Sequence, residues 1–529
     1  MKIRMPLIAG AAAAAVLLAC GTPRQAPFPG EDPPRLVLLL VIDQLRYDYL
    51  TRFGSGFTGG IRRLLDDGAV FTNAYLDHYP SVTAIGHSTM LTGARPSISG
   101  IVGNDWYDRA EGRNVTSVED PETTLLGLGA GGGERNGSSP HRLQVSTLGD
   151  ELKLAFPGSR TVGVSFKDRG AILPVGRSAD AAFWWHVATG TFVTSTWYFE
   201  EMPAWVARFN EGNLVDQWAG REWRALDGGA VLDTLPTQPG PDYYGALYDS
   251  PFGNELVVSF AEATLENMGL GRDETTDVLA VSFSTNDHVG HDVGPYAPKV
   301  KDVTLQTDRA IGTLLQAVER RVGLARTIVV LTADHGVSPV PEDLAKHKMA
   351  NGRQEREKLV DTAKQALVDA YGPGLWVEGR SGSSLYLNRN LIALKGLDPA
   401  AVQQTAATGV EKRPEVWRAY TRAQLLEGRV PPDPWSRRVL LSFNRDSSGD
   451  VEVLLEPYWM AQESPGTTHG TPYSYDTHIP LILMGPGIRA GRYDATVVLN
   501  DLAPTLATLL GVETPSGSSG RALAEALAH

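Results

Sequence analysis

The stretch Leu36-Val-Leu-Leu-Leu-Val-Ile42-Asp43 decides the fold. It has seven apolar residues in a row, without the alternation of a half-exposed strand, and it ends at a carboxylate. Such a run is typical of a parallel strand that is buried on both faces. The sequence therefore predicts a sheet with helices on both sides, and it places Asp43 at the carboxyl end of a central strand.

Four more apolar runs of this kind follow along the chain, and helical periodicity separates several of them. They are Val162–Phe166, Val278–Phe283, Thr327–Thr332 and Ile479–Met484. The alternation of strands and helices predicts a doubly wound, mostly parallel α/β sheet flanked by helices. Ligands of such sheets bind beyond the carboxyl ends of the strands, where Asp43, Lys167, Asp287 and Asp334 are expected.

The composition excludes several classes of protein. A chain of 529 residues, with 42% hydrophobic and 21% charged residues, is globular and too long for one simple core. A formal charge of −13 argues against nucleic acid as a partner. Cys20 is the only cysteine, so an internal disulfide is excluded, and metal ligands have to come from His, Asp and Glu.

The N-terminus is predicted to be an export signal of the lipoprotein type, residues 1–20, followed by a tether, residues 21–34. The apolar run of the signal is too short for a membrane-spanning helix. Its end resembles a lipoprotein cleavage box, so we expect Cys20 to be lipidated. An ordinary signal peptide is the alternative. We expect an exported protein of the periplasm or cell envelope that meets a membrane only through its lipid.

Residues 35–529 are predicted to form one catalytic domain with insertions. Residues of about 105–150 and 175–250 are expected to be cap insertions beside the site. Between about residues 345 and 468, charged helical stretches and proline-rich turns replace the strands that end in polar residues. This part of the chain is predicted to be an inserted subdomain.

The sequence contains a set of metal-ligand candidates. Asp287-His-Val-Gly-His291 places two of them four residues apart, which alone is a weak signal. The combination is stronger, because further candidates stand beside predicted strands: Asp43, Asp334, His335 and His478. Six such groups suffice for two metal ions with three ligands each.

Seven segments resemble, in the same order along the chain, motifs of the alkaline phosphatase superfamily. They are Asp43-Gln44, Ser81–His87, Gly100–Asn104, Lys167–Arg169, Asp287–His291, Thr332–Gly336 and Tyr475–His478. The chain is most similar to the bacterial phosphate monoesterases with a threonine nucleophile, which have the fold of type I phosphodiesterases and nucleotide pyrophosphatases. The resemblance runs from about residue 36 to the C-terminus.

This resemblance implies a site with two zinc ions and with Thr83 as the nucleophile. One zinc ion would be bound by Asp287, His291 and His478, and the other by Asp43, Asp334, His335 and the Thr83 oxygen. A threonine hydroxyl becomes nucleophilic when a base or a metal removes its proton. Thr83 would then form a phosphothreonine intermediate, with Asn104, Lys167 and Arg169 contacting the phosphoryl group. Manganese or calcium at one site is an open alternative.

Several of these residues also have a plainer interpretation. Thr83 precedes a predicted helix and could serve as its N-cap. His87 is at least as well explained as a packed structural histidine, and Lys167-Asp-Arg169 as a solvated charge cluster. His469, in Thr467-Thr-His-Gly470, is expected near the site but not as a ligand.

The predicted activity is therefore the hydrolysis of small phosphate monoesters, with release of inorganic phosphate. The nearest alternative is a nucleotide phosphodiesterase or pyrophosphatase. Lys167 and Arg169 argue against it, because a monoester carries a second negative charge that added cations would stabilise. A sulfatase is disfavoured because no segment for making formylglycine surrounds Thr83. A catalytically silent surface lipoprotein is the remote alternative, and the natural substrate and oligomeric state stay open.

Overall fold

The computed structural model describes residues 33–128, 136–212, 214–462 and 465–528. The predicted signal peptide with Cys20, and all of the predicted tether except its last two residues, lie outside these ranges. Within them, no helix combines the length and the apolar character that crossing a membrane requires.

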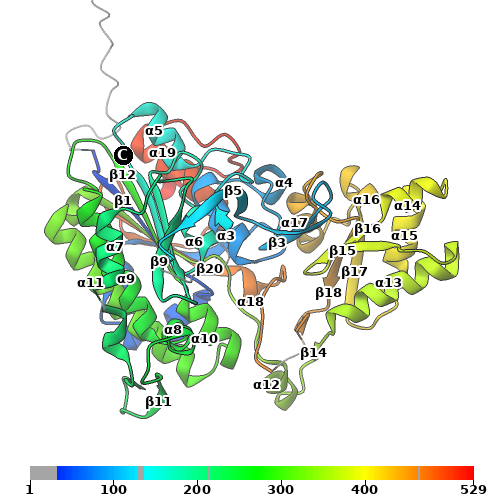
Figure 1. Cartoon of the computed structure of the whole chain (residues 1–529), viewed down its shortest axis with the longest axis horizontal. Coiled ribbons are helices and arrows are strands. Elements are labelled where there is room, and N and C mark those ends of the chain that lie inside the picture. Colours follow the sequence, from blue (N-terminus) through cyan, green and yellow to red (C-terminus); the bar gives the residue numbers. More distant parts are fainter. Residues whose placement is uncertain (1–32, 129–135, 213, 463–464, 529) are drawn as a thin grey trace, which may run out of the picture.

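A central sheet of twelve strands forms the larger body of the protein (Figure 1). Its middle strands are parallel, in the order β13 (Thr327–Thr332), β1 (Leu36–Ile42), β12 (Asp277–Phe283), β7 (Thr161–Ser165) and β8 (Ala181–His186). All seven residues of β1 are fully buried. The apolar run that opens the chain's fold is thus the centre of a sheet covered on both faces, as predicted.

The outer strands make the sheet mixed. On one side, β20 (His478–Met484) runs antiparallel between β13 and β2 (Ala69–Tyr75), and the short β21 (Gly491–Tyr493) and β22 (Val497–Val498) pair with β2. On the other side, the antiparallel strands are β9 (Thr191–Ser195), β5 (Glu119–Leu126) and β6 (Asn136–Ser138). Parts of the segments 105–150 and 175–250 that were expected to cap the site therefore extend the sheet instead.

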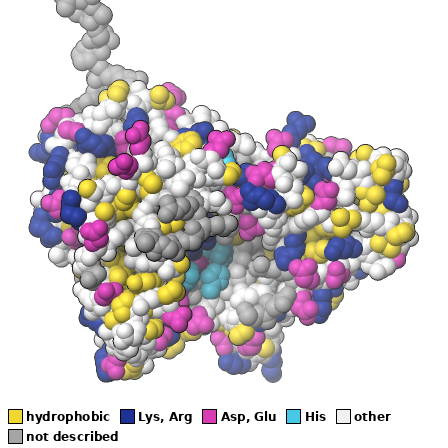
Figure 2. All heavy atoms as spheres, in the orientation of Figure 1, with side chains coloured by type: hydrophobic (Ala, Val, Ile, Leu, Met, Phe, Trp, Pro, Cys, Tyr) yellow, Lys and Arg dark blue, Asp and Glu magenta, His cyan; other side chains and the backbone are white. Residues whose placement is uncertain are grey.

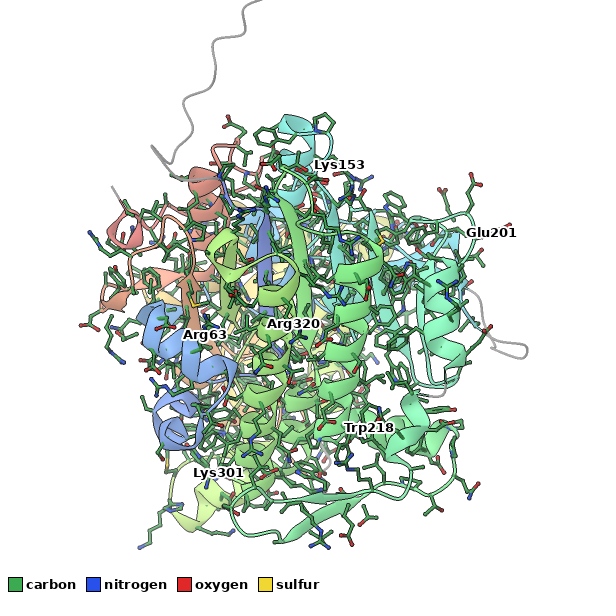
Figure 3. All side chains as sticks on the ribbon, turned by 90° about the vertical axis from the view of Figure 1, so that its left-hand side faces the viewer. Arg63, Lys153, Glu201, Trp218, Lys301 and Arg320 are labelled. Atoms are coloured by element: carbon green, nitrogen blue, oxygen red, sulfur yellow. The ribbon has the colours of Figure 1, made fainter. Side chains whose placement is uncertain are left out.

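Helices cover both faces of this sheet. One group consists of α2 (Gly60–Asp67), α9 (Pro251–Asn267) and α11 (Pro298–Arg321), which lie in front of the sheet in Figure 3, where Arg320 marks α11. The other group consists of α3 (Thr83–Thr92), α5 (Leu148–Ala155), α6 (Asp168–Ile172) and α19 (Leu502–Leu510). A Cβ at Gly163 of β7 would lie 1.9 Å from the Ala171 carbonyl oxygen, so this glycine lets α6 pack directly on the sheet.

A smaller body lies beside the larger one (Figure 1) and has its own hydrophobic core. Its antiparallel sheet has the order β15 (Val377–Ser381), β16 (Ser384–Leu387), β18 (Val451–Leu455) and β17 (Val416–Thr421). Its helices are α13 (Arg356–Tyr371), α14 (Arg389–Leu394), α15 (Pro399–Val410), α16 (Arg422–Leu426) and α17 (Pro434–Ser442). Tyr79 of the larger body packs with Tyr420 and Phe443 of the smaller one, which joins the two.

Shorter elements complete the chain. The helices are α1 (Tyr47–Arg52), α4 (Pro96–Ser99), α7 (Ala204–Glu211), α8 (Pro241–Tyr248), α10 (Thr285–Val293), α12 (Pro341–Lys346) and α18 (Ser474–Thr477). The strand pairs are β3 (Asp105–Asp108) with β4 (Arg113–Thr116), β10 (Glu222–Arg224) with β11 (Val231–Thr234), and β14 (Gly352–Arg353) with β19 (Trp459–Met460). The pair of β14 and β19 joins the two segments through which the chain enters and leaves the smaller body.

The central strand should carry much of the stability. We expect Leu39→Ala, at a fully buried position of β1, to lower the free energy of unfolding by about 2–5 kcal/mol, because it leaves a cavity in a packed core. The matched control is Leu154→Ala in α5, where the leucine is 77% exposed and the change should stay within about 0.5 kcal/mol. Urea denaturation of both variants measures the difference, and similar losses would contradict this account of the core.

Candidate active site

Three carboxylates meet at the carboxyl end of the parallel strands. Asp43 directly follows β1, Asp334 comes two residues after β13, and Asp287 lies in the first turn of α10, which follows β12. All three side chains are buried. Because β13, β1 and β12 are neighbours, their ends gather these residues at one point of the sheet edge.

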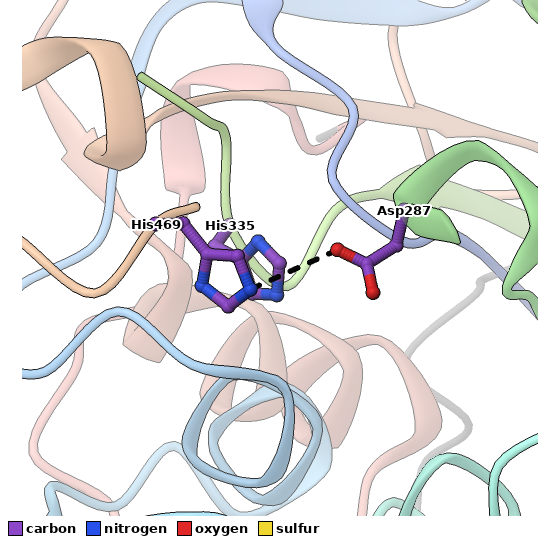
Figure 4. Close-up of side chains that lie close together, drawn as sticks. All are labelled: Asp287, His335 and His469. Carbon is purple, nitrogen blue, oxygen red and sulfur yellow. Dashed lines mark ion pairs between the residues drawn. The ribbon is translucent and has the colours of Figure 1, made fainter. Parts of the chain in front are cut away.

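Two adjoining groups of side chains have the geometry to hold metal ions. One consists of Asp43, Asp334 and His335, and the other of Asp287, His335 and His469, with the ligand atoms of each group within 4.8 Å of one another. Figure 4 shows Asp287 facing the two histidines, whose rings stack with centroids 3.5 Å apart. His291, one helical turn after Asp287, places its Nε2 3.1 Å from the Asp287 Oδ1.

The three histidines at the site are oriented in the same way. Each Nδ1 lies near a backbone carbonyl oxygen: His291 at 2.8 Å from Thr467, His335 at 3.0 Å from Gly336, and His469 at 2.7 Å from Ser81. A carbonyl can only accept, so Nδ1 carries the hydrogen, and in the neutral ring Nε2 keeps a free lone pair. Metal-binding histidines typically have this arrangement.

Two buried oxygen atoms of the first group have no hydrogen-bond partner, Asp43 Oδ1 and Asp334 Oδ2. Burial, together with the charges of Asp287 and Asp334, raises the pKa of Asp43 to about 7. Unpartnered buried oxygen atoms are rare and need an explanation. Together with the Nε2 atoms of the histidines they fit a divalent cation that accepts nitrogen and oxygen ligands, such as zinc.

Lys167 joins the two groups. Its Nζ lies 2.6 Å from Asp43 Oδ2 and 2.5 Å from Asp287 Oδ2. Burial alone would lower the pKa of Lys167, but the two carboxylates raise it well above its usual value. Burial likewise opposes ionisation of Asp287, but His291 and Lys167 hold its pKa well below the usual range. The lysine is therefore a permanent positive charge at the centre of the site.

Arg169 lies in the first turn of α6, which begins at Asp168 with Lys167 as its N-cap. The buried Arg169 Nε has no hydrogen-bond partner, and among the described residues the guanidinium forms an ion pair with Asp168 alone, at 3.7 Å. Its donors thus remain available to an anion.

Thr83 is the first residue of α3, and Val82 holds the N-cap position. The plainer interpretation of Thr83 as a helix cap is therefore wrong. Its Oγ1 lies 3.4 Å from His335 Nε2. Asn104 Oδ1 accepts a hydrogen bond of 2.8 Å from the Ala84 N–H, so Asn104 fixes the start of the helix beside the nucleophile candidate. Helix starts of this kind favour anions.

His478 does not join the other candidates, which corrects its prediction as a ligand. Its Nε2 lies 2.9 Å from the Thr72 carbonyl oxygen, and its ring stacks between Tyr47 and Tyr75. His478 is the first residue of β20 and pairs with Tyr75 of β2, so its ring lies among these tyrosines and not at the ligand groups. His469, in the preceding loop, occupies the position expected for His478.

Two further residues support the ligands, and one of them, Gln44, was not among the predicted site residues. Gln44, with a φ of 66°, donates from its backbone N–H to Asp334 Oδ1 at 3.1 Å and from Nε2 to Asp287 Oδ1 at 2.6 Å. His87 bonds the Thr83 carbonyl oxygen at 2.9 Å and lies 3.3 Å from Asp334 Oδ2. In the sequence, the position of Gln44 directly after the ligand candidate Asp43 is the only feature that could have identified it as a supporting residue.

Comparisons with known proteins agree with this geometry. A model of the type I phosphodiesterase/nucleotide pyrophosphatase family matches residues 37–478. Alkaline phosphatase PafA of Elizabethkingia meningoseptica is 34% identical over 520 residues, 93% of this chain and 94% of that protein. Alkaline phosphatase PhoV of Synechococcus elongatus is 32% identical over 518 residues, 93% of each chain. The alignment with the crystal structure of wild-type PafA covers 94% of this chain and 100% of the PafA chain. Its TM-score is 0.87 and the sequence identity is 33%.

The chain therefore belongs to the type I phosphodiesterase/nucleotide pyrophosphatase family, within the alkaline phosphatase superfamily. It is an enzyme with a buried site that fits two metal ions.

The correction from His478 to His469 can be tested by metal content. We expect His469→Ala to weaken binding of one of two metal ions by more than about a hundredfold, because even residues that only orient metal ligands contribute about 10–100-fold. His478→Ala serves as the matched control and should keep both ions, since its ring stacks on two tyrosines and its Nε2 bonds the Thr72 carbonyl oxygen. Elemental analysis after dialysis measures this. Metal loss in the His478 variant alone would restore the original prediction.

Proposed function

We propose that this protein hydrolyses phosphate monoesters with Thr83 as the nucleophile, at a site with two zinc ions. The observation that carries the proposal is the position of Thr83 Oγ1 beside His335, the residue common to the two ligand groups. Lys167 and Arg169 support the monoester as substrate. Several relatives that match over nearly the whole chain are named alkaline phosphatases, which supports the same activity.

The ligand atoms support zinc in both groups. Asp43, Asp334 and His335 would bind one ion, and Asp287 and His469 would bind the other together with His291, whose Nε2 lies 3.1 Å from Asp287 Oδ1. Zinc ions bound there would lower the pKa of the Thr83 hydroxyl and stabilise charge on the phosphate oxygen atoms. Gln44 and His87 would hold the ligands in place. This role is expected of hydrogen-bond partners that orient metal ligands.

In the proposed reaction the Thr83 oxygen attacks phosphorus, and the bond between phosphorus and the alcohol oxygen breaks. The alcohol leaves, and water then cleaves the phosphothreonine to release inorganic phosphate and regenerate the hydroxyl. The free guanidinium donors of Arg169 and the amide of Asn104 would bind the non-bridging oxygen atoms. We also propose that the protein is exported and lipid-anchored through Cys20, which rests on the sequence alone.

The contrast between monoester and diester substrates tests this assignment. The double change Lys167→Ala with Arg169→Ala should lower kcat/KM for an aryl monoester by orders of magnitude, because each lost charge contact removes roughly 3 kcal/mol from the transition state. Hydrolysis of the matching diester should fall far less, since it lacks the second negative charge. Steady-state kinetics on both substrates measures the two effects.

Two controls complete this experiment. Lys346→Ala with Arg429→Ala removes two exposed cations that belong neither to the ligand groups nor to α6, and it should change neither rate. Thr83→Ala should abolish both activities and yet keep bound metal. Equal losses on monoester and diester in the Lys167/Arg169 variant would remove the support for a monoesterase and favour the phosphodiesterase alternative.

A further inference from the structure

A cavity of about 300 Å³ opens between the two bodies of the protein, next to the candidate active site. The larger body contributes Asn104, His291 and His469 to its wall, and the smaller body contributes Glu452 and Trp459. Figure 2 shows histidine side chains, in cyan, in the hollow between the two bodies. The cavity is thus continuous with the ligand groups.

The wall of the cavity is acidic and aromatic. Among the described residues that line it there is no Lys or Arg, whereas Asp105 and Glu452 contribute carboxylates. Four aromatic side chains surround the same space: Tyr79, Tyr386, Phe443 and Trp459. Carboxylates and aromatic faces together attract cations, and they disfavour anions.

Glu452, from β18, is one of the two carboxylates in the wall of the cavity. Its Oε1 accepts hydrogen bonds from Ser384 Oγ at 2.7 Å and from the Gly449 N–H at 3.2 Å. No Lys, Arg or His of the described chain forms an ion pair with it. Burial raises its pKa to about 6, so the group is a carboxylate at neutral and alkaline pH. An anion in such a place needs a cationic partner.

The position of the cavity fits the departing alcohol. In an in-line displacement the leaving group departs on the side opposite the nucleophile. Thr83 stands beside His335 and the Asp43 group, whereas His291 and His469 belong to the side of Asp287 and line the cavity. The alcohol of a substrate attacked by Thr83 would therefore point into this space.

We propose that the cavity binds the alcohol part of the substrate and that Glu452 selects phosphate monoesters whose alcohol carries an ammonium group. The inference rests on the proposed function and specifies its substrate class. An alcohol with a further anionic group would approach Asp105 and Glu452 without a compensating Lys or Arg among the described lining residues. A neutral alcohol would leave the Glu452 carboxylate unpaired. The volume suits a small alcohol.

The test compares three substrates of similar size: 2-aminoethyl phosphate, propyl phosphate and phosphoglycolate. Glu452→Gln keeps the acceptor for Ser384 and Gly449 but removes the charge. Since the three alcohols differ in leaving ability, the quantity of interest is the ratio of kcat/KM between wild type and variant for each substrate. We expect at least a tenfold loss for 2-aminoethyl phosphate, no loss for propyl phosphate, and a gain for phosphoglycolate.

Two further variants control for indirect effects. Glu427→Gln changes an exposed glutamate of the smaller body, outside the cavity, and should leave all three ratios at one. Glu452→Asp retains the charge and should keep most of the preference for the ammonium substrate. Equal changes for all three substrates in Glu452→Gln would assign Glu452 a structural role only and overturn the proposal.

Binding of non-hydrolysable analogues gives a readout that does not depend on turnover. Calorimetry should show that wild type binds 2-aminoethylphosphonate at least tenfold more tightly than propylphosphonate, and that Glu452→Gln removes this difference. Failure of the proposed function itself would appear as no hydrolysis of any monoester by wild type, including an aryl phosphate. In that case the binding of the two phosphonates still tests whether Glu452 selects an ammonium group. Equal binding of the two analogues by wild type would refute this role of Glu452.

Discussion

The site depends on one constraint, which is the burial of three carboxylates, Asp43, Asp287 and Asp334, at the ends of three adjacent strands. Like charges in a low-dielectric interior repel one another, and each alone is costly to bury. Only cations placed among them can balance this charge. Lys167 supplies one positive charge between Asp43 and Asp287, and the unpartnered oxygen atoms of Asp43 and Asp334 fit a metal ion. The position of the rest of the site follows from this requirement.

The two bodies have different roles in the proposed function. The larger body supplies the rigid parallel strands that bring the carboxylates together, and close packing allows α3 to reach them, since a Cβ at Gly86 would lie 2.4 Å from the Asp334 carbonyl oxygen. The smaller body contributes no residue to the two ligand groups among the described residues, but it forms one wall of the adjoining cavity. In our account the chemistry comes from the first body and the choice of substrate from the second.

Much of this arrangement is visible in the sequence, because buried parallel strands leave long apolar runs. The runs before Asp43, Lys167 and Asp334 and the run before Asp287 became β1, β7, β13 and β12, and the sheet rim gathered those side chains as expected. The run Ile479–Met484 looks the same in a parallel or an antiparallel strand. Its antiparallel direction could therefore not be predicted. The sequence also does not show that the His478 ring stacks between Tyr47 and Tyr75 and bonds the Thr72 carbonyl oxygen.

Other features have no periodic signal at all. His469 lies in an irregular loop, and only the packing of that loop against Ser81 brings its ring to Asp287. The helix α6 begins at Asp168, between Lys167 and Arg169. Sequence patterns do not locate the first residue of a helix to within one residue. Glu452 stands in an ordinary strand of the smaller body, and its role arises only from the contact between the two bodies.

The most direct test of the central claim is anomalous diffraction at the zinc edge from crystals of the zinc-loaded protein. The account predicts two anomalous peaks, one bounded by Asp43, Asp334 and His335, and one by Asp287, His291 and His469. A single peak, or a peak coordinated by His478 in place of His469, would contradict it.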